Sequence, residues 1–367
     1  MRVLVSGGGT GGHIYPALAF LRYVKSVEPA SEFLFVGTTR GLESRIVPAE
    51  GIDFAPVEIQ GIRRSLSPAN LKTAWLFLKG LGKSKQILRD FKPDVVLGTG
   101  GYVAGPVVYE ATKLGIPTVI HEQNSFPGVS NKFVKNKVDL VFTAFPEAEK
   151  FFKPGTVQLV GNPRGEEVAN VAIDDSVLSA YGLDPAKKTV VIFGGSRGSL
   201  TINESVIDAL GHFEQVDYQI LYACGEIYWE DYKEIFAKYE DVPNIKIVKY
   251  ISNMPEVLKN SDLVVGRAGA TSIAEITALG LPAILIPSPN VTADHQTKNA
   301  MSLVNAGAAK MITDAESNGV ILGETIDEII DHDDVLAAMS EASFKIGIRD
   351  TSQRMYKEIK ALINEKN

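Results

Sequence analysis

Short runs of apolar, mostly β-branched residues recur along the chain and alternate with longer stretches of helical character. The runs are continuous rather than alternating with polar residues, which is typical of strands buried on both faces of a parallel sheet. In the first half the predicted strands are Arg2–Ser6, Phe33–Val36, Asp94–Leu97, Thr118–His121 and Leu140–Thr143. In the second half they are Thr189–Phe193, Gln219–Ala223, Ile245–Val248, Asp262–Val265 and Ala283–Ile286. The pattern predicts an α/β protein whose parallel sheets are covered by helices.

Both halves of the chain begin with a buried strand, a glycine-rich loop and a helix. The first loop follows Val5 and the second follows Phe193, so the two openings lie roughly 190 residues apart. This spacing predicts two Rossmann-like, doubly wound domains that face a central cleft. We place a first domain at 1–163 and a second at 164–345. A helix within 346–367 is able to pack back on the first domain.

Length, charge and cysteine content narrow the class of protein. A chain of 367 residues suits two domains, and its net charge of −7 disfavours nucleic-acid binding, which needs a basic field. Cys224 is the only cysteine, which excludes an internal disulfide and predicts a plain core thiol. No signal peptide and no membrane-spanning run are evident, so we expect the body of the protein to be cytoplasmic.

Three glycine-rich loops follow predicted strands, at 7–13, 98–102 and 194–198. Backbone N–H groups at the start of a helix bind anions, so three such loops suggest that several phosphates are bound. The first loop also matches the G-x-G-x-x-G pattern of NAD-dependent oxidoreductases. That class needs an acidic residue at the end of the second strand, which here ends in Thr38-Thr39. The first acid beyond it, Glu43, lies too far along, so NAD binding is disfavoured.

Three further polar clusters follow predicted strands. His121–Asn124 is either a solvated loop or a wall that grips a polyhydroxylated ligand. In Gly266–Glu275, Ser272 and Glu275 have the spacing of a capping box, and Glu275 is equally suited to bind ribose hydroxyls. Asp294–Asn299 begins a helix with Asp294 near its N-cap, and its Gln296 is a candidate for sugar hydroxyls.

Together these motifs resemble the MurG family of peptidoglycan N-acetylglucosaminyltransferases. The matching segments, in order along nearly the whole chain, are Gly8–His13, Gly98–Tyr102, His121–Asn124, Gly161–Arg164, Gly194–Gly198, Ala270–Glu275 and Asp294–Ala300. The resemblance implies a GT-B fold and an inverting, metal-independent reaction without a cofactor. GlcNAc would pass from UDP-GlcNAc to the 4-hydroxyl of MurNAc in undecaprenyl-pyrophosphoryl-MurNAc-pentapeptide, converting lipid I to lipid II.

The same resemblance implies a cellular role and a set of partners. It implies cell-wall synthesis, with effects on cell shape and division, on the cytoplasmic face of the bacterial cell membrane. The expected partners are UDP-GlcNAc, the undecaprenyl-linked acceptor, an anionic membrane surface and other cell-wall synthesis proteins, and nucleic acid is not among them.

The resemblance also assigns roles to individual residues. The second domain would bind the donor, with Ser196 and Thr271 on the phosphates, the Ile251 backbone on uracil and Glu275 on ribose. The remaining donor contacts it implies are Thr10, Gly11, Gly12, Asn124, Arg164, Ala270 and Gln296. The acceptor and phosphate loops of the first domain would contribute Gly9, Gly100, Gly101 and Tyr102.

The reaction requires a base that takes the proton of the attacking hydroxyl. His13 follows the first glycine loop, and the unperturbed pKa of a histidine side chain suits a base at neutral pH. Glu122 is the rival, because carboxylates also act as bases. The helix N-termini after 194–198 and after Ala270 can stabilise the leaving UDP without a metal. The one Asp-rich string, Asp331–Asp334, lies in a late polar segment that favours helix capping.

The segment 63–92 is strongly basic in an otherwise acidic chain. Eight basic residues and one acidic residue give it a net charge of +7. It also holds bulky apolar residues, which favours a helix lying in an anionic membrane interface over one that only buries an apolar face. The residues predicted to contact the membrane are Lys72, Trp75, Leu76, Lys79, Lys83 and Lys85.

Four alternatives remain open. Another glycolipid-forming UDP-sugar transferase and the non-hydrolysing UDP-GlcNAc 2-epimerase share the predicted fold, although an epimerase needs no lipid acceptor. An NAD-dependent oxidoreductase and a non-catalytic nucleotide-sugar-binding protein belong to different classes.

Overall fold

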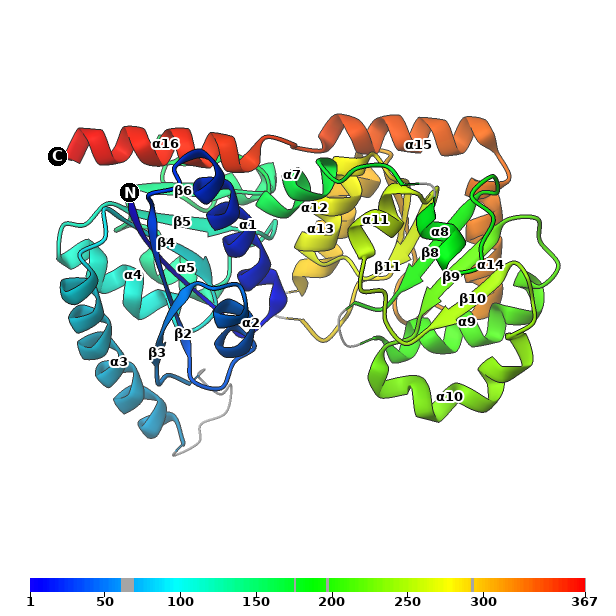
Figure 1. Ribbon diagram of the computed structural model, residues 1–367, viewed down its shortest axis with the longest axis horizontal. Helices are drawn as coiled ribbons and strands as arrows, with labels where there is room; N and C mark the ends of the chain where they lie inside the picture. Colours follow the sequence, from blue (N-terminus) through cyan, green and yellow to red (C-terminus); the bar gives the residue numbers. More distant parts are fainter. Residues whose placement is uncertain (61–68, 175, 196–197, 292–293, 367) are drawn as a thin grey trace. The chain divides into compact units, whose positions relative to one another are not determined.

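The computed structural model describes residues 1–60, 69–174, 176–195, 198–291 and 294–366. The chain forms two compact units (Figure 1). Met1–Arg164 and Asp350–Asn367 make up the first domain, and Gly165–Arg349 makes up the second. The chain therefore leaves the first domain once and returns to it after completing the second.

The first domain is built on one parallel sheet. Its strands within the described residues are β1 (Arg2–Gly7), β2 (Glu32–Thr38), β3 (Asp53–Val57), β4 (Val95–Gly100), β5 (Thr118–Glu122), β6 (Leu140–Thr143) and β7 (Val157–Leu159). They are ordered β3-β2-β1-β4-β5-β6-β7, and each neighbouring pair is parallel. The order reverses between β1 and β4, and a crevice at the carboxyl ends of the strands is expected at such a point.

Helices cover both faces of this sheet. They are α1 (Gly11–Val27), α2 (Glu43–Ala49), α3 (Ala69–Phe91), α4 (Ala104–Lys113), α5 (Val129–Val134), α6 (Pro146–Glu149) and α16 (Thr351–Lys366). Alternate β1 side chains enter opposite layers: Val3 and Val5 pack with α1 and α16, whereas Leu4 packs with α3 and α4. Helix α16 lies against α1 and buries Met355, Ile359 and Ile363 in the first of these layers.

The second domain repeats the plan. Its strands within the described residues are β8 (Thr189–Phe193), β9 (Gln219–Ala223), β10 (Ile245–Val248), β11 (Leu263–Gly266), β12 (Ala283–Leu285) and β13 (Ala309–Met311). They are parallel and ordered β10-β9-β8-β11-β12-β13. The two doubly wound parallel-sheet domains predicted from the sequence are thereby confirmed, although β3, β7 and β13 were not predicted.

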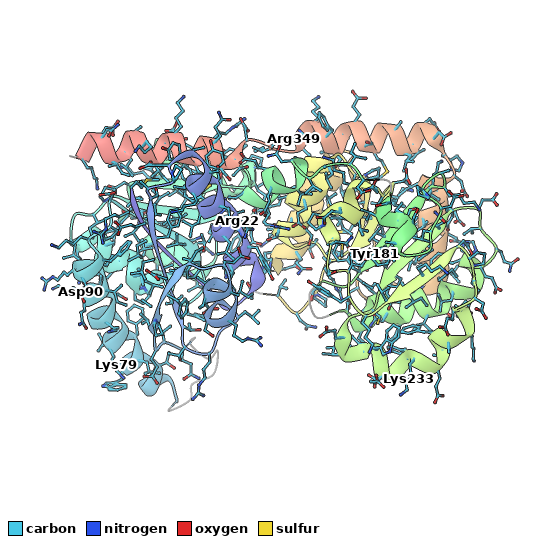
Figure 2. All side chains as sticks on the ribbon, in the orientation of Figure 1. Arg22, Lys79, Asp90, Tyr181, Lys233 and Arg349 are labelled. Atoms are coloured by element: carbon cyan, nitrogen blue, oxygen red, sulfur yellow. The ribbon has the colours of Figure 1, made fainter. Side chains whose placement is uncertain are left out.

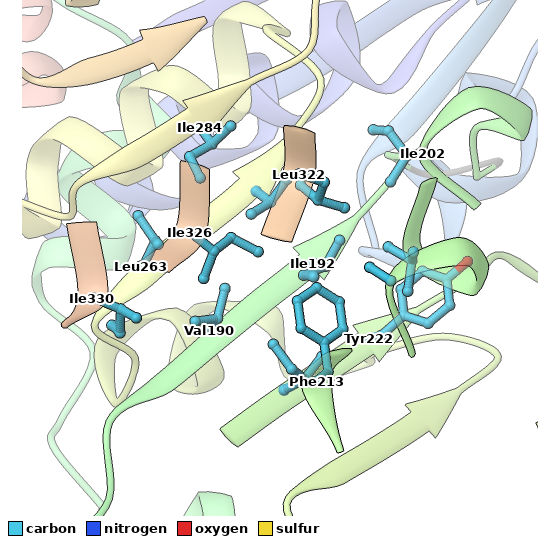
Figure 3. Close-up of a cluster of buried hydrophobic side chains, with 14 of the residues drawn as sticks. Val190, Ile192, Ile202, Phe213, Tyr222, Leu263, Ile284, Leu322, Ile326 and Ile330 are labelled. Carbon is cyan, nitrogen blue, oxygen red and sulfur yellow. The ribbon is translucent and has the colours of Figure 1, made fainter. Parts of the chain in front are cut away.

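Nine α-helices and two 3₁₀ turns complete the described part of this domain and its junction. They are α7 (Pro163–Ala169), α8 (Ser176–Ala180), α9 (Leu200–Phe213), η1 (Glu226–Tyr228), α10 (Trp229–Phe236), η2 (Ala237–Tyr239), α11 (Met254–Lys259), α12 (Ala270–Leu279), α13 (His295–Asn305), α14 (Gly319–Ile330) and α15 (Asp333–Ile346). Strand β8 supplies Val190 and Ile192 to a core that α9 and α14 close with Phe213 and Ile326 (Figure 3). Cys224 lies in this core, and burial raises the pKa of its thiol to about 11. This agrees with the predicted core cysteine.

Candidate active site

The first glycine loop joins β1 to α1 at the carboxyl end of the sheet. Gly9 has φ +87°, a conformation that side chains rarely adopt, and Thr10 is the extended N-cap residue of α1. Gly11 and Gly12 form the first helical residues. The predicted strand, glycine loop and helix therefore occur where expected, and backbone N–H groups of a helix N-terminus lie at this edge of the sheet.

The second glycine loop, after β4, packs directly on the first. A Cβ on Gly101 would lie 2.3 Å from the carbonyl oxygen of Gly8, and one on Gly100 would lie 2.7 Å from Cδ2 of His13. The Thr99 hydroxyl donates to the backbone oxygen of His13 at 2.7 Å. A side chain at Gly101 would therefore meet the Gly8 backbone, and one at Gly100 would meet the His13 ring. Tyr102, at the end of this loop, is exposed.

The His13 ring is oriented by the first loop itself. Its Nδ1 lies 2.9 Å from the carbonyl oxygen of Gly8. A carbonyl only accepts hydrogen bonds, so Nδ1 carries the proton and donates it. In the neutral ring the lone pair is then on Nε2, the atom able to act as a base.

Glu43 is a buried residue of this site that sequence reasoning did not select. It is the first residue of α2 and is 0% exposed. Its Oε2 accepts from Gly9 N at 3.0 Å, and its Oε1 accepts from the backbone N and the hydroxyl of Thr38 at 2.8 and 2.6 Å. Burial raises the pKa of Glu43, but these hydrogen bonds outweigh burial and lower it below its usual value. Glu43 therefore holds the glycine loop as a buried carboxylate.

The segment 121–124 is neither a solvated loop nor, for most of its length, a ligand-gripping wall. His121 and Gln123 are buried, and their side chains bond to each other at 3.1 Å. His121 Nε2 donates to Gly161 O at 2.8 Å, and Gln123 Nε2 donates to Thr99 O at 2.8 Å. Burial lowers the pKa of His121 to about 4, so the ring is neutral at neutral pH. These side chains brace the loops, and Asn124 is the member that is only partly buried.

Both carboxylate oxygens of Glu122 accept hydrogen bonds from the segment that follows it. Oε1 accepts from the backbone and side-chain nitrogens of Asn124, at 3.0 and 3.3 Å. Oε2 accepts from Gly128 N at 2.9 Å and from the Asn131 amide at 2.8 Å. Glu122 is 1% exposed. Its geometry is that of a group that shapes the segment 122–131.

Arg164 is the last of the predicted site residues in the first domain. Its backbone N–H donates to the Asn162 side chain at 3.1 Å. Its guanidinium lies over the ring of Tyr15, 5.9 Å from the ring centre. Because Tyr15 belongs to the first turns of α1, Arg164 brings a positive charge to the neighbourhood of the first glycine loop.

The glycine loop of the second domain joins β8 to α9. Gly195 has φ +90° and Gly198 has φ +78°, while the predicted phosphate ligand Ser196 lies outside the described residues. Ser199 caps α9, and its hydroxyl accepts from the Arg267 guanidinium at 2.5 Å. Arg267 also donates to Asp314 at 2.5 Å and to Ile286 O at 3.0 Å. This arginine therefore ties together the loops that follow β8, β11, β12 and β13.

Helix α12 begins earlier than a capping box at Ser272 requires. Its N-cap is Gly269, so Ser272 lies inside the first turn and the capping-box interpretation is wrong. Ala270 is buried and opens the helix. Thr271 and Glu275 are four residues apart and share one helix face, and Glu275 is buried. Thr271 Oγ1 is buried without a hydrogen-bond partner among the described residues, which is unusual for a hydroxyl.

The remaining predicted donor contacts also lie after strands of the second sheet. Ile251, beyond β10, is buried, with a relative exposure of 1%. Asp294 is the N-cap residue of α13, as predicted, with φ +52°. Gln296 Oε1 accepts from Ser288 N at 2.8 Å, which directs the amide toward the loop after β12.

No group of three or more potential metal ligands is found in the described part of the chain. The string Asp331–Asp334 spans the junction of α14 and α15, with Asp331 as the C-cap of one helix and His332 as the N-cap of the other. Asp333 pairs with Lys188 at 2.5 Å. These are helix-end roles, as the sequence favoured.

Helix α3 presents one basic and apolar face. Trp75 and Leu78 are 59% and 66% exposed, and Lys79, Lys83 and Lys85 are also exposed (Lys79 is labelled in Figure 2). Among the described residues, no helix combines the length and apolar character needed to span a bilayer.

One residue of the predicted membrane patch is on the opposite face of α3. Leu76 is only 4% exposed, so its assignment to the surface was wrong. It lies on the inner face with Thr73, Ile87 and Leu88, all of which are buried. Gly80 is also buried and faces Val57, so it permits close packing of α3. The side chain of Lys72 lies outside the described part of the helix.

Comparison with known proteins gives matches over both domains. Residues 3–143 match the family model of the glycosyltransferase family 28 N-terminal domain, and residues 189–355 match that of its C-terminal domain. A curated relative from Lactococcus lactis subsp. cremoris is 52% identical over 364 residues, covering 99% of this chain and 100% of its own. One from Bacillus licheniformis is 50% identical over 362 residues, covering 99% of each chain. Both are named UDP-N-acetylglucosamine–N-acetylmuramyl-(pentapeptide) pyrophosphoryl-undecaprenol N-acetylglucosamine transferase.

Solved structures agree over the full length. The crystal structure of Acinetobacter baumannii MurG has a TM-score of 0.80 at 26% identity, covering 98% of this chain and 99% of that one. The S. aureus MnaA–UDP co-structure has a TM-score of 0.70 at 19% identity, covering 99% and 97%, and supports the fold alone.

Proposed function

Because the chain belongs to glycosyltransferase family 28, we propose that it transfers GlcNAc from UDP-GlcNAc to the 4-hydroxyl of MurNAc in undecaprenyl-pyrophosphoryl-MurNAc-pentapeptide. The observation that carries this proposal is the 52% identity, over 99% of this chain and thus over both domains, to a relative named for that reaction. The product is lipid II, so the protein acts in peptidoglycan synthesis, and its loss affects cell shape and division.

His13 is the base in this proposal. Its Nδ1–H is committed to the Gly8 carbonyl, so Nε2 is the ring atom with a lone pair. Nε2 takes the proton of the 4-hydroxyl as the hydroxyl oxygen attacks the anomeric carbon and the bond to UDP breaks. Glu122 is the weaker candidate because its two oxygens already accept four hydrogen bonds. Its role in the proposal is to position Asn124, whose amide contacts the transferred sugar.

The second domain binds the donor. The helix N-termini at α9 and α12 direct N–H groups and the positive end of the helix dipole at the diphosphate, which stabilises UDP as it leaves. Thr271 donates to a phosphate oxygen, Glu275 accepts from ribose hydroxyls, and Gln296 contacts the GlcNAc. This electrostatic stabilisation requires no metal ion or cofactor.

The role of Thr271 is tested by removing its hydroxyl. We expect Thr271→Val to weaken UDP binding about 10-fold to 100-fold, because a hydrogen bond to a charged acceptor contributes about 1.5–3 kcal/mol. Since Thr271 Oγ1 has no partner among the described residues, the free energy of unfolding should not fall. Calorimetric titration with UDP and a denaturant melt measure the two quantities.

Thr277→Val is the matched control on the same helix. Its hydroxyl donates to Ile273 O at 2.9 Å and is buried within the domain. This variant should bind UDP normally. Equal UDP affinity of Thr271→Val and the wild type would remove Thr271 from the phosphate site.

The first domain binds the acceptor and the membrane. The glycine loops containing Gly9, Gly100 and Gly101 supply backbone N–H groups to the acceptor pyrophosphate, apart from the Gly9 N–H, which donates to Glu43. Tyr102 lies beside them. The outer face of α3 supplies exposed lysines around Trp75 and Leu78, and Phe133 of α5, 46% exposed, adds to it by contacting Phe77. Such a surface suits the anionic cytoplasmic face of the bacterial membrane, where a lipid-linked acceptor would be found.

Neutralising this surface should weaken membrane binding. We expect replacement of Lys79, Lys83 and Lys85 by glutamine to lower the affinity for anionic vesicles by about 10-fold to 100-fold, at about 1 kcal/mol per lysine. Lys79 contributes least, because it pairs with Glu58 at 3.1 Å. Vesicle co-sedimentation measures the effect.

Three exposed lysines of the second domain provide the control, Lys233, Lys238 and Lys345 (Lys233 is labelled in Figure 2). Their replacement by glutamine changes the net charge by the same amount and should leave vesicle binding unchanged. An equal loss in both triple variants would mean that net charge, rather than the α3 surface, determines binding.

The proposed reaction is tested by following UDP release from UDP-GlcNAc with and without a lipid I analogue, using UDP-glucose as the control donor. Acceptor-dependent release that is specific for UDP-GlcNAc supports the proposal. No release, with conversion of UDP-GlcNAc to its 2-epimer, would replace it by the epimerase reaction.

A further inference from the structure

One peptide group of the first glycine loop is held from both ends. The peptide that joins Gly8 to Gly9 has the carbonyl of Gly8 and the N–H of Gly9. Its N–H donates to Glu43 Oε2 at 3.0 Å, and its carbonyl accepts from His13 Nδ1 at 2.9 Å. A buried carboxylate and the ring of the proposed base are therefore connected through a single peptide plane.

The surroundings of Glu43 are shaped to its carboxylate. A Cβ on Gly8 would lie 2.4 Å from Oε1, and a Cβ on Gly41 would lie 2.3 Å from either oxygen. A Cβ on Gly37 would lie 2.5 Å from Cγ. Glycines at all three positions leave room for the carboxylate, and Thr38 donates twice to the oxygen that does not face Gly9. Glu43 is thus fixed in one orientation relative to the loop.

We propose that Glu43 is a positioning residue for His13, acting through the Gly8–Gly9 peptide. The carboxylate fixes the peptide plane so that its carbonyl faces Nδ1, which keeps the proton on Nδ1 and the lone pair on Nε2. Hydrogen bonds in a chain polarise one another, so the negative charge also strengthens the Gly8 carbonyl as an acceptor and stabilises the imidazolium. Glu43 stays ionised, no proton crosses the peptide, and the proton from the acceptor hydroxyl ends on Nε2. The inference rests on the proposed role of His13 as the base.

Other charges around this loop act against the imidazolium. His13 is in the first turn of α1, and the positive end of that helix disfavours a cation there. Arg164 lies over Tyr15, the titratable side chain two residues beyond His13. Neither group changes when Glu43 is replaced, and α1 carries no acidic residue in its first turn. Glu43 is therefore the acidic side chain coupled to this peptide.

The test replaces the charge and keeps the size. In Glu43→Gln, the side-chain NH₂ group faces the N–H donor of either Gly9 or Thr38. Two donors cannot bond to each other, so at least one hydrogen bond is lost. We expect kcat to fall about 10-fold to 100-fold, the range found when a group that orients a metal-bound histidine is removed. The KM for UDP-GlcNAc should be unchanged, and the acidic limb of the kcat–pH profile should move to lower pH, because the imidazolium loses its stabilisation.

A second readout does not depend on catalysis. The ¹⁵N shifts of the His13 ring, followed by NMR through a pH titration of the free protein, report the tautomer and the pKa. The wild type should be in the Nδ1–H form, and Glu43→Gln should mix the tautomers and lower the pKa. An unchanged titration in Glu43→Gln would overturn the inference. A changed titration in a protein that releases no UDP would instead overturn only the proposed function.

Asp139→Asn is the matched control. Asp139 Oδ2 also accepts from a threonine N–H and hydroxyl, those of Thr118 at 2.8 and 2.9 Å, but at the start of β5, the opposite end of that strand from the glycine loops. Loss of the Asp139 carboxylate should lower the free energy of unfolding by a comparable amount. It should leave the tautomer and the pKa of His13 unchanged. If Glu43→Gln does not fold, Thr38→Val removes one bond that orients the carboxylate and should shift the titration in the same direction by less. Equal shifts in Asp139→Asn would show a general loss of stability and overturn the inference.

Discussion

Replacing His13 with alanine is expected to lower kcat by about 100-fold to 10,000-fold, the usual contribution of a general base. The KM for UDP-GlcNAc should change little, because the predicted contacts to UDP come from the second domain. A loss confined to kcat is the signature of an interaction made in the transition state. Steady-state assays of UDP release, with the lipid I analogue held at saturation, measure both constants.

His212→Ala is the matched control for this prediction. His212 is in the last turn of α9, its side chain is 44% exposed, and its Nε2 lies 2.9 Å from Asp327. Near-normal turnover of His13→Ala would exclude His13 as the base and return attention to Glu122. Restoration of the rate of His13→Ala by added imidazole would support the proposed proton transfer.

The second large effect is expected from adding one methyl group to the second glycine loop. In Gly101→Ala, the new Cβ would lie 2.3 Å from Gly8 O at a backbone φ of +82°. Because the contact is with backbone, the two loops must separate, and the Gly8 carbonyl that orients His13 moves with them. We expect kcat to fall at least about 100-fold, as a displacement of about 1 Å can cause.

Gly115→Ala separates the contact from the backbone strain. Gly115 follows α4 with φ +73°, and a Cβ there would meet nothing within 4 Å. It should cost only the strain of a left-handed alanine, about 1–2 kcal/mol in the free energy of unfolding, and leave turnover unchanged. If both variants are equally active, the close approach of the two glycine loops has no part in catalysis.

The strands that the sequence did not predict are all at sheet edges. Strands β3 and β7 end the order of the first sheet, and β13 ends that of the second. An edge strand pairs on one side only, so it needs no continuous apolar run. Pro56 interrupts β3, and β13 has only three residues with Lys310 at its centre. Central strands, which neighbours bury on both sides, were recognised because their composition is apolar throughout.

The sequence located the chemical motifs, but it did not predict the direction in which their side chains point. The polar run 121–124 suggested a ligand surface, whereas tertiary hydrogen bonds to Thr99 and Gly161 bury most of it. Leu76 differed from its neighbours only in helix rotation, which depends on where α3 packs. Glu43 was dismissed because it is distant from β2 in sequence, and only the fold returns its carboxylate to Gly9. Spacing predicts which residues share an edge, whereas burial decides which of them remain available.

The return of α16 to the first domain has a consequence for biosynthesis. Met355, Ile359 and Ile363 fill one layer of the first core, yet they leave the ribosome only after every residue of the second domain. The order of folding therefore differs from the order of synthesis: the second domain can finish its core while the first still presents an unfilled apolar surface over α1. A nascent chain arrested before residue 350 would expose that surface to chaperones, and translation of the last helix is the step that covers it.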